Sequence, residues 1–467
     1  AVAQIEPLPP PAPPAPVAPA RDEDKRKLAY NMAPAATLES ISVSGAMVSP
    51  SVAQPQAGDI NTEKYADHDD NPVHRTAEQP VSTFSIDVDT GSYTNVRRML
   101  NQGQLPPGDA VRAEEFINYF DYAYAPPADR KTPFAVHTEV APAPWNAKRQ
   151  LMLVGIQGYE IAAREIPAAN IVFLIDTSGS MDSPDKIGLL KQSFMAMVPK
   201  LREQDRISIV VYAGSAGLVL PPTSGADHET ILAAFDRLSA GGSTNGAAGI
   251  ELAYQQAKRA YIEGGVNRVI LATDGDFNVG TVDMEALKTM VAEQRRSGVS
   301  LTTLGFGQGN YNDELSEQLA DIGNGNHAYI DTLNEGHKVL VEEMSSTLFT
   351  IAKDVKIQVE FNPAVVSEYR LIGYENRMLA REDFNNDAVD AGEIGAGHDV
   401  TAIYEVVLAG SGGESVDPLR YGANATVKHG GDELAFVKLR YKQPDADTST
   451  LIERPIKRSQ IAKEASP

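Results

Sequence analysis

The chain has 467 residues, a formal net charge of −22 and no cysteine. The negative charge argues against nucleic acid or an anionic membrane surface as the main partner. The lack of cysteine excludes disulfides, thiolate metal sites and a cysteine nucleophile. The longest apolar runs are far shorter than the ~20 residues needed for a transmembrane segment. The length allows two or three domains with a large buried core.

The first part of the chain is rich in proline and alanine. Proline alternates with small residues over positions 7–19, a composition that favours extended polyproline II and buries no core. We therefore expect residues 1–79 to form a disordered tail and linker. Residues 38–45 resemble the strand-forming segment near the start of TonB-dependent outer-membrane transporters, which suggests a link to TonB-type or other outer-membrane components; a plain solvated linker is the alternative.

The start of the chain suggests export from the cytoplasm. It begins with Ala1-Val-Ala, which fits the remnant of a signal-peptidase site, although a trimmed terminus gives the same start. We expect an extracytoplasmic location, in the periplasm or cell envelope of a Gram-negative bacterium.

Residues 80–165 are expected to form the first part of a β-rich domain with two short helices. Alternating and helically spaced apolar residues support these elements. We expect strands at 81–88, 134–140 and 150–158, and helices at 92–101 and 110–120.

Residues 166–351 show a different pattern, in which strands alternate with amphipathic helices. We expect strands at 170–175, 206–212, 218–220, 268–273, 300–305 and 327–330. Helices are expected at 185–200, 228–238, 246–262, 284–297, 312–322 and 335–349. This alternation predicts an α/β domain with a doubly wound, mostly parallel sheet.

Strands dominate again in residues 352–445. We expect them at 355–361, 369–373, 400–408 and 433–441. The simplest arrangement joins this part with residues 80–165 into one sandwich-like β domain, into which the α/β domain is inserted. Residues 446–467 are polar, and we expect a loose tail.

Hard oxygen ligands cluster where the first strand of the α/β domain ends. Asp176 follows five apolar residues, and Ser178 and Ser180 follow at alternate positions. In an open α/β sheet, ligands bind beyond the carboxyl ends of the strands. A carboxylate and two hydroxyls there form a ligand set that Mg²⁺ prefers.

Two further loops have the composition to complete this site. Thr244 follows a glycine-rich segment just before a helix, and Asp274 ends the strand expected at 268–273. Both loops belong at the same edge of a parallel sheet. Asp182 and Asp276 lie beside the motif residues, where they either support the ligands indirectly or serve in plain turns.

The three segments together resemble the metal-ion-dependent adhesion site of von Willebrand factor type A domains. The matching positions are Asp176, Ser178, Ser180, Thr244 and Asp274. The resemblance covers about residues 170–350. The flanks, at 84–93, 115–120 and 371–376, are similar to the bacterial extracytoplasmic subgroup often labelled Ca-activated chloride channel homologues.

This resemblance implies a function in protein binding. In such domains a divalent cation, most often Mg²⁺ with Mn²⁺ or Ca²⁺ as alternatives, keeps one coordination position free. An Asp or Glu carboxylate of a partner protein fills that position. The resemblance therefore implies a metal-dependent adhesion or scaffold protein of the envelope with no catalysis of its own, and a possible shift of the last helix of the domain, at 335–349, on ligand binding.

A weaker metal signal lies in the second β-rich segment. Asp383, Asn385 and Asp387 place oxygen ligands at alternate positions, as at the start of a calcium loop. Ala388 stands where the turn glycine belongs, and Ile394 stands in place of the final glutamate. An acidic solvated loop is the alternative.

Two other functions remain open at this point. A metal-dependent hydrolase would use the same ion but needs a general base, and the motif loops offer only aspartates that the metal already binds. A structural envelope component would use the metal only to stabilise the loops. Lost partner binding, lost hydrolysis or a lowered melting temperature without the metal would separate the three.

Overall fold

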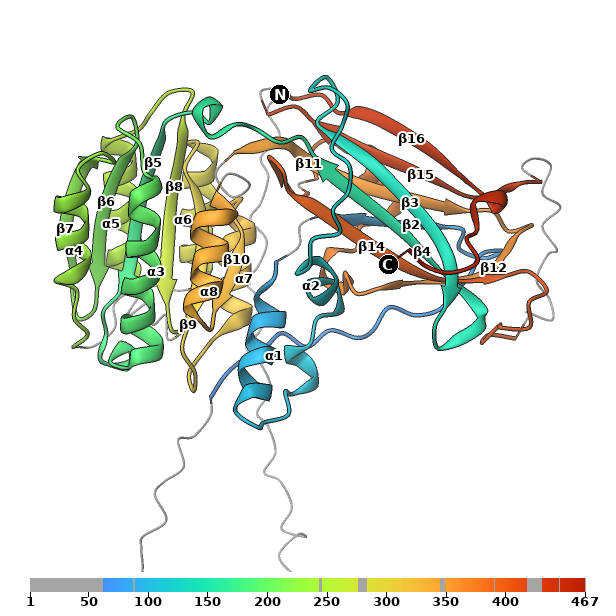
Figure 1. Cartoon of the computed structure of the whole chain (residues 1–467), viewed down its shortest axis with the longest axis horizontal. Helices are drawn as coiled ribbons and strands as arrows, with labels where there is room; N and C mark the ends of the chain where they lie inside the picture. The colour runs from blue at the N-terminus through green and yellow to red at the C-terminus, as the bar shows by residue number, and fades with distance from the viewer. Residues whose placement is uncertain are drawn as a thin grey trace, which may run out of the picture. The chain divides into compact units, whose positions relative to one another are not determined.

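The computed structural model of the chain describes residues 62–86, 89–242, 246–275, 284–344, 349–389, 391–417, 431–444 and 446–466 (Figure 1). These residues belong to one of the two units into which the chain divides, the unit from Asp59 to Pro467. In this described part, no helix is both long and apolar enough to cross a bilayer.

A six-stranded sheet forms the centre of the α/β domain. Its strands are β5 (Ala169–Asp176), β6 (Arg206–Tyr212), β7 (Ala216–Ser224), β8 (Val266–Thr273), β9 (Ser300–Phe306) and β10 (His327–Ile330), in the order β10-β9-β8-β5-β6-β7. All neighbouring pairs are parallel except β6 and β7. The strand β5 is buried along its whole length, as its run of apolar residues predicts.

Helices cover both faces of this sheet (Figure 1). They are α3 (Leu189–Met197), α4 (His228–Asp236), α5 (Gly246–Arg259), α6 (Met284–Arg296), α7 (Asp313–Ile322) and α8 (Leu333–His337). One apolar cluster includes Phe194 and Phe235, from α3 and α4. A second, on the other face, includes Ile250 and Leu287, from α5 and α6. The expected doubly wound arrangement is confirmed.

Two antiparallel sheets form the β-rich part. The first joins β1 (His74–Arg75), β12 (Val366–Ile372), β14 (Asp399–Leu408), β4 (Asn146–Gly158) and β3 (Phe134–Ala143), in that order. The second joins β13 (Ile394–Gly395), β11 (Thr350–Phe361), β15 (Glu433–Lys442) and β16 (Thr450–Lys457), with β2 (Val81–Ser85) also paired to β11.

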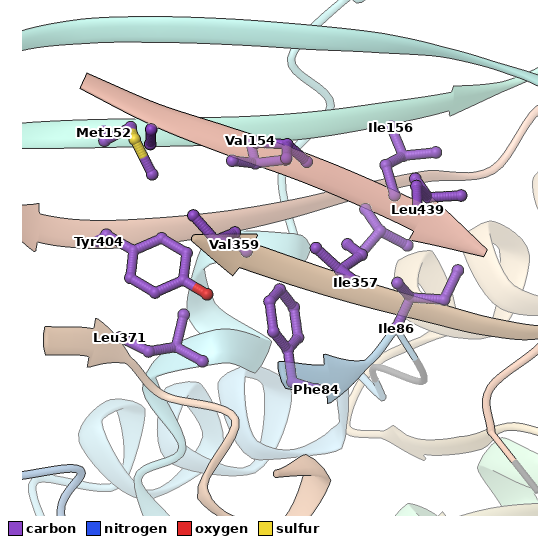
Figure 2. Close-up of a cluster of buried hydrophobic side chains, with 14 of the residues drawn as sticks. Phe84, Ile86, Met152, Val154, Ile156, Ile357, Val359, Leu371, Tyr404 and Leu439 are labelled. Atoms are coloured by element: carbon purple, nitrogen blue, oxygen red, sulfur yellow. The ribbon is translucent and has the colours of Figure 1, made fainter. Parts of the chain in front are cut away.

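The core of the β-rich part lies between these two sheets. Figure 2 shows Met152, Val154 and Ile156 of β4 facing Ile357 and Val359 of β11. All of them are at most 1% exposed. Alternate residues of each strand therefore point into one shared core, which makes this part a sandwich.

Strand pairing confirms that the α/β domain is inserted into the sandwich. The strand β2 pairs with β11, and β4 pairs with β14. In each pair, one strand precedes the α/β domain in the sequence and the other follows it. The two halves of the β-rich part therefore cannot form their sheets without each other.

Two short helices precede the first long sandwich strands. They are α1 (Gly91–Asn101) and α2 (Ala113–Asn118). The latter is shorter than the helix expected at 110–120, since Val111 and Arg112 are extended after a 3-10 turn and the helix ends at Asn118. The Thr94 hydroxyl donates to the Tyr329 carbonyl of β10 at 2.7 Å. The Thr401 N–H of β14 donates to the Asn118 side chain at 2.7 Å. These helices thus contact both the α/β domain and the sandwich.

Three boundary predictions need correction. Residues 62–79, which were expected to belong to the disordered tail and linker, are ordered, because Lys64 forms a β-bridge with Asn312 and β1 pairs with β12. Residues 1–61 lie outside the described residues. In place of the helix expected at 335–349, the structure has α8 followed by a π-helical turn, Lys338–Glu342. The strand expected at 355–361 is β11, which already begins at Thr350.

The expected loose C-terminal tail instead contains β16, which pairs antiparallel with β15 along its length. Only Ile456 of this strand is fully buried. Because β16 is an edge strand with Glu453 and Pro455 on its exposed surface, its sequence lacks the apolar alternation by which strands are recognised.

Candidate metal centre

Asp176, Ser178 and Ser180 lie together at the carboxyl end of β5. The Asp176 side chain is fully buried, and its Oδ1 accepts a 2.8 Å hydrogen bond from the Ser178 N–H. The hydroxyl oxygens of Ser178 and Ser180 lie 2.9 Å apart. Ser180 is exposed, so the cluster extends from the buried end of the strand to the surface.

Backbone hydrogen bonds hold the glycine-rich loop against this cluster. The Gly179 N–H donates to the Gly242 carbonyl at 3.0 Å, and the Gly241 N–H donates to the Thr177 carbonyl at 2.8 Å. Gly242 has a φ of 101°, a conformation that favours glycine. Thr244, two residues further along, lies outside the described residues, as does Asp276. Their part in the site stays a prediction.

Asp274 follows β8, the strand that pairs with β5, and is fully buried. The next residue, Gly275, has a φ of 91°, and a Cβ atom there would lie 2.1 Å from the Asn312 backbone nitrogen. Only glycine allows this close turn. The sheet thus places the two predicted aspartates at the ends of neighbouring strands.

Two further hydroxyls form hydrogen bonds with the Asp176 carboxylate. Tyr212 and Thr273 donate to its Oδ2 at 3.1 Å and 3.3 Å. Burial raises the pKa of Asp176 to about 6, and the negative charge of Asp274 contributes to the rise. A cation beside these carboxylates would favour their charged forms.

Lys186 is the site residue that the sequence prediction missed. Its Nζ donates to Asp274 Oδ2 and to Asn310 Oδ1, both at 3.0 Å. Its stem packs over Gly307, where a Cβ atom would lie 2.2 Å from the Lys186 Cγ. A signal was available, because Lys186 lies one helical turn before the fully buried Leu190, and a lysine on a buried helix face requires a charged partner.

The donor set fits a hard divalent cation. Adjacent ligands of an octahedral Mg²⁺, each ~2.0–2.1 Å from the ion, lie ~2.9 Å apart. The Ser178 and Ser180 hydroxyls form a hydrogen bond with each other at 2.9 Å, so their oxygens already lie at a separation that two ligands of one ion can adopt. Across the described residues, three or more His, Asp or Glu side chains nowhere form a group suited to a metal ion, so a cation here would have to be held by hydroxyls plus two carboxylates.

Comparison with known proteins assigns the family. The model of the von Willebrand factor type A domain matches residues 170–343. A model named von Willebrand factor matches residues 59–153, and the model "Uncharacterized protein YfbK, C-terminal" matches residues 346–467. YfbK of Escherichia coli is 52% identical over 403 residues, which cover 85% of this chain and 70% of YfbK. The chain belongs to the YfbK family of von Willebrand factor type A domain proteins.

More distant relatives share parts of this YfbK-family chain. The protein sll0103 of Synechocystis is 28% identical over 210 residues, which cover 44% of this chain and 49% of that protein. A solved von Willebrand factor type A structure from Catenulispora acidiphila is 16% identical and covers 72% of this chain and 75% of that one, with a TM-score of 0.42. The predicted family resemblance is confirmed, and an intact metal site stays a prediction.

The remaining predicted site residues of this YfbK-family member lie apart from the cluster or in plain roles. Asp182 is exposed, and its N–H donates to the Gly179 carbonyl at 3.3 Å. In the weaker calcium candidate, Arg440 donates to Asn385 at 2.9 Å and to Asp387 at 3.1 Å. Asp383 lies in the same 3-10 turn as Asn385. Because a guanidinium already binds these oxygens, the arrangement disfavours Ca²⁺ there.

Proposed function

We propose that this protein binds an acidic side chain of a partner protein through a divalent cation, most often Mg²⁺. The cation would be held by the two serines of the cluster and by the aspartates of the neighbouring strands. The proposed ligands are Asp176, Ser178, Ser180, Thr244 and Asp274. The proposal includes no catalytic step.

One observation supports this proposal more than any other. The Ser178 and Ser180 hydroxyls lie side by side at the spacing of two ligands of one ion, directly beyond the buried Asp176. Hydroxyls coordinate a cation without neutralising it. The ion would therefore keep most of its charge at the exposed end of the cluster, where a partner can reach it.

The charge balance around the cluster supports an acidic partner. Asp176 and Asp274 with Lys186 carry one net negative charge. A divalent cation together with these three side chains would carry one net positive charge. In a protein with a formal net charge of −22, such a local positive charge favours a carboxylate with a defined approach.

We further propose that this binding takes place in the bacterial envelope. The chain has no cysteine that could form unwanted disulfides in an oxidising compartment. Its proline-rich segment at 7–19 has the composition of a spacer, which would place the binding site at a distance from an attachment point.

The test combines metal titration with partner capture on the full chain. Mg²⁺ binding is measured by calorimetry, and partners from envelope extract are cross-linked with Mg²⁺ or with EDTA. We expect both signals to be lost in Asp176→Ala and Thr244→Ala and retained in Asp182→Ala, which removes an exposed carboxylate beside the motif.

Other outcomes contradict the proposal. A partner that binds equally well in EDTA, together with a lower melting temperature on metal removal, would indicate a purely structural metal. Hydrolysis of generic phosphate esters that Asp176→Ala abolishes would indicate a metal-dependent hydrolase.

A further inference from the structure

A cavity of about 610 Å³ lies near the amino ends of β8 and β9, where their first residues meet the sandwich. Arg268 and Thr302, from β8 and β9, line it together with Asn376 and Glu393 from the sandwich. The candidate metal centre lies at the carboxyl ends of the same strands. The cavity is therefore separate from that site, and its volume suits a small molecule.

Arg268 is a buried cation that forms no ion pair with any residue in the described part of the chain. Its side chain is 3% exposed, and its Nη1 donates to the Thr302 hydroxyl at 2.6 Å. Its Nε has no hydrogen-bond partner, and it forms no ion pair with a carboxylate of the described residues. An unpaired charge in such an environment costs several kcal/mol.

The other two buried arginines of the described chain each have a carboxylate in direct contact, as Arg268 does not. Arg98 pairs with Glu63 at 2.9 Å, and Arg112 pairs with Asp313 at 2.7 Å. Both are about as buried as Arg268, at 9% and 6% exposed. Burial of an arginine in this protein is thus normally accompanied by a carboxylate in direct contact.

Glu393 does not supply that contact. Its two carboxylate oxygens accept hydrogen bonds from Asn324 at 2.7 Å and Thr350 at 3.0 Å. Burial lowers the pKa of Arg268 to about 10, and the charge of Glu393 partly opposes this. The guanidinium therefore remains charged at neutral pH, and no carboxylate of the described residues forms a direct ion pair with it.

We propose that Arg268 and Thr302 bind the carboxylate or phosphate group of a small molecule in this cavity. The Thr302 oxygen accepts from Arg268, so its hydroxyl hydrogen can donate to the same anion. Guanidinium and hydroxyl donors side by side are a common way to bind such groups.

The rest of the lining restricts the molecule further. The Asn376 Oδ1 is buried and has no donor, so a hydrogen-bond donor on the ligand would satisfy it. The lining also includes Asp121, Glu160 and Asp399, and these carboxylates disfavour a polyanion. The ligand class is therefore a molecule with one anionic group that also carries hydrogen-bond donors.

The test measures anion-dependent thermal stability of the full chain. Acetate and inorganic phosphate, as separate probes, are titrated at constant ionic strength against chloride. For the wild type we expect a saturating rise in melting temperature of about 2–4 °C with at least one probe. We expect Arg268→Met to abolish that rise. Arg130→Met, which removes a half-exposed arginine, is expected to retain it.

Thr302→Val provides a second variant in case Arg268→Met does not fold. We expect it to lower the apparent affinity for the same anion at least tenfold. A carboxylate ligand is indicated by a response to acetate, and a phosphate ligand by a response to phosphate. The proposal is overturned if neither probe raises the melting temperature more than chloride does, or if Arg268→Met shows the same rise as the wild type. EDTA is present throughout, so failure of the metal proposal would not affect this result.

Discussion

Both ends of strand β8 hold a buried charged side chain, and they differ in how that charge is paired. At the carboxyl end, the fully buried Asp274 has an ion-pair partner in Lys186 at 3.0 Å. Near the amino end, the equally buried Arg268 has a hydroxyl neighbour but no ion-pair partner among the described residues. Within the described part of the chain, one buried charge has an ion-pair partner and the other has none.

This difference indicates what each end can do. A buried carboxylate with an internal cation is stable on its own, and a metal ion can replace or supplement that cation. A buried cation that has no carboxylate in direct contact gains stability when an anion binds to it. Removing a charged group should therefore be costly at the first end and nearly neutral, or favourable, at the second. The first prediction below tests the first end, and the Arg268→Met variant described above tests the second.

The largest effect is expected for Lys186→Met in EDTA. This substitution leaves the Asp274 carboxylate buried without its cation, and we expect a loss of ~3–5 kcal/mol in the free energy of unfolding, measured by urea titration. Saturating Mg²⁺ should restore part of the loss. Lys200→Met, at an exposed position, is the control. A loss below ~1 kcal/mol, or one that Mg²⁺ does not change, would show that Lys186 does not compensate the site.

The next effect concerns metal affinity. Asp176→Ala removes the carboxylate at the base of the cluster, and we expect Mg²⁺ affinity to fall ~100-fold or more in calorimetry. Ser178→Ala should also weaken binding, since it removes one of the paired hydroxyls. Mg²⁺ affinity of Asp176→Ala within threefold of the wild type would place the ion elsewhere.

Glu114 extends the comparison to a buried charge that can titrate. It is 3% exposed, its Oε2 has no hydrogen-bond partner, and burial raises the pKa of its carboxyl to about 7. Because the pKa of this carboxyl is higher in the folded protein than in the unfolded chain, protonation of Glu114 stabilises the folded state. Stability from this group is therefore present below pH ~4.5 and is lost as the pH rises to about 7.

Glu114→Gln should remove this pH dependence. At pH 8 we expect the variant to exceed the wild type by ~3 kcal/mol in unfolding free energy, and at pH 5 by less than ~1 kcal/mol. Urea titrations at both pH values provide the measurement. A difference that is the same at pH 5 and pH 8 would refute the assignment of a charged, unpaired Glu114.

The smallest effect is expected for Thr273→Val. Its hydroxyl donates to Asp176 at 3.3 Å and accepts from the Gly275 N–H at 3.1 Å. Losing both bonds should cost about 1 kcal/mol in unfolding free energy. Thr223→Val, which removes a hydrogen bond on an exposed strand, is expected to change little. Equal changes in unfolding free energy for Thr273→Val and Thr223→Val would mean that the hydrogen bonds of Thr273 with Asp176 and Gly275 do not stabilise the fold.

Much of the fold was predictable from the sequence, for a physical reason. Strands buried on both faces, such as β5 and β8, contain uninterrupted runs of apolar residues, and the helices between them have regular apolar spacing. The edge strand β16 was missed because half-exposed, polar residues fill it. Local patterns predict elements whose burial is strong and regular, and they do not predict weakly buried edges.

The candidate site shows the same limit. Asp176, Ser178 and Ser180 were predictable because the motif is local, and Asp274 because strand ends meet at one edge. Lys186 was not predicted, since its partner Asp274 lies 88 residues away. The unpaired state of Arg268 could not be predicted either, because the absence of a partner becomes visible only when all neighbours are in place.

The most direct test of the central claim is anomalous diffraction from crystals of the full chain soaked in Mn²⁺, which can replace Mg²⁺ in oxygen sites. The account predicts one strong anomalous peak within about 2.5 Å of both the Ser178 and the Ser180 hydroxyl oxygens. No peak there at saturating Mn²⁺, with Lys186 still bound to Asp274, would contradict a metal-dependent binding site.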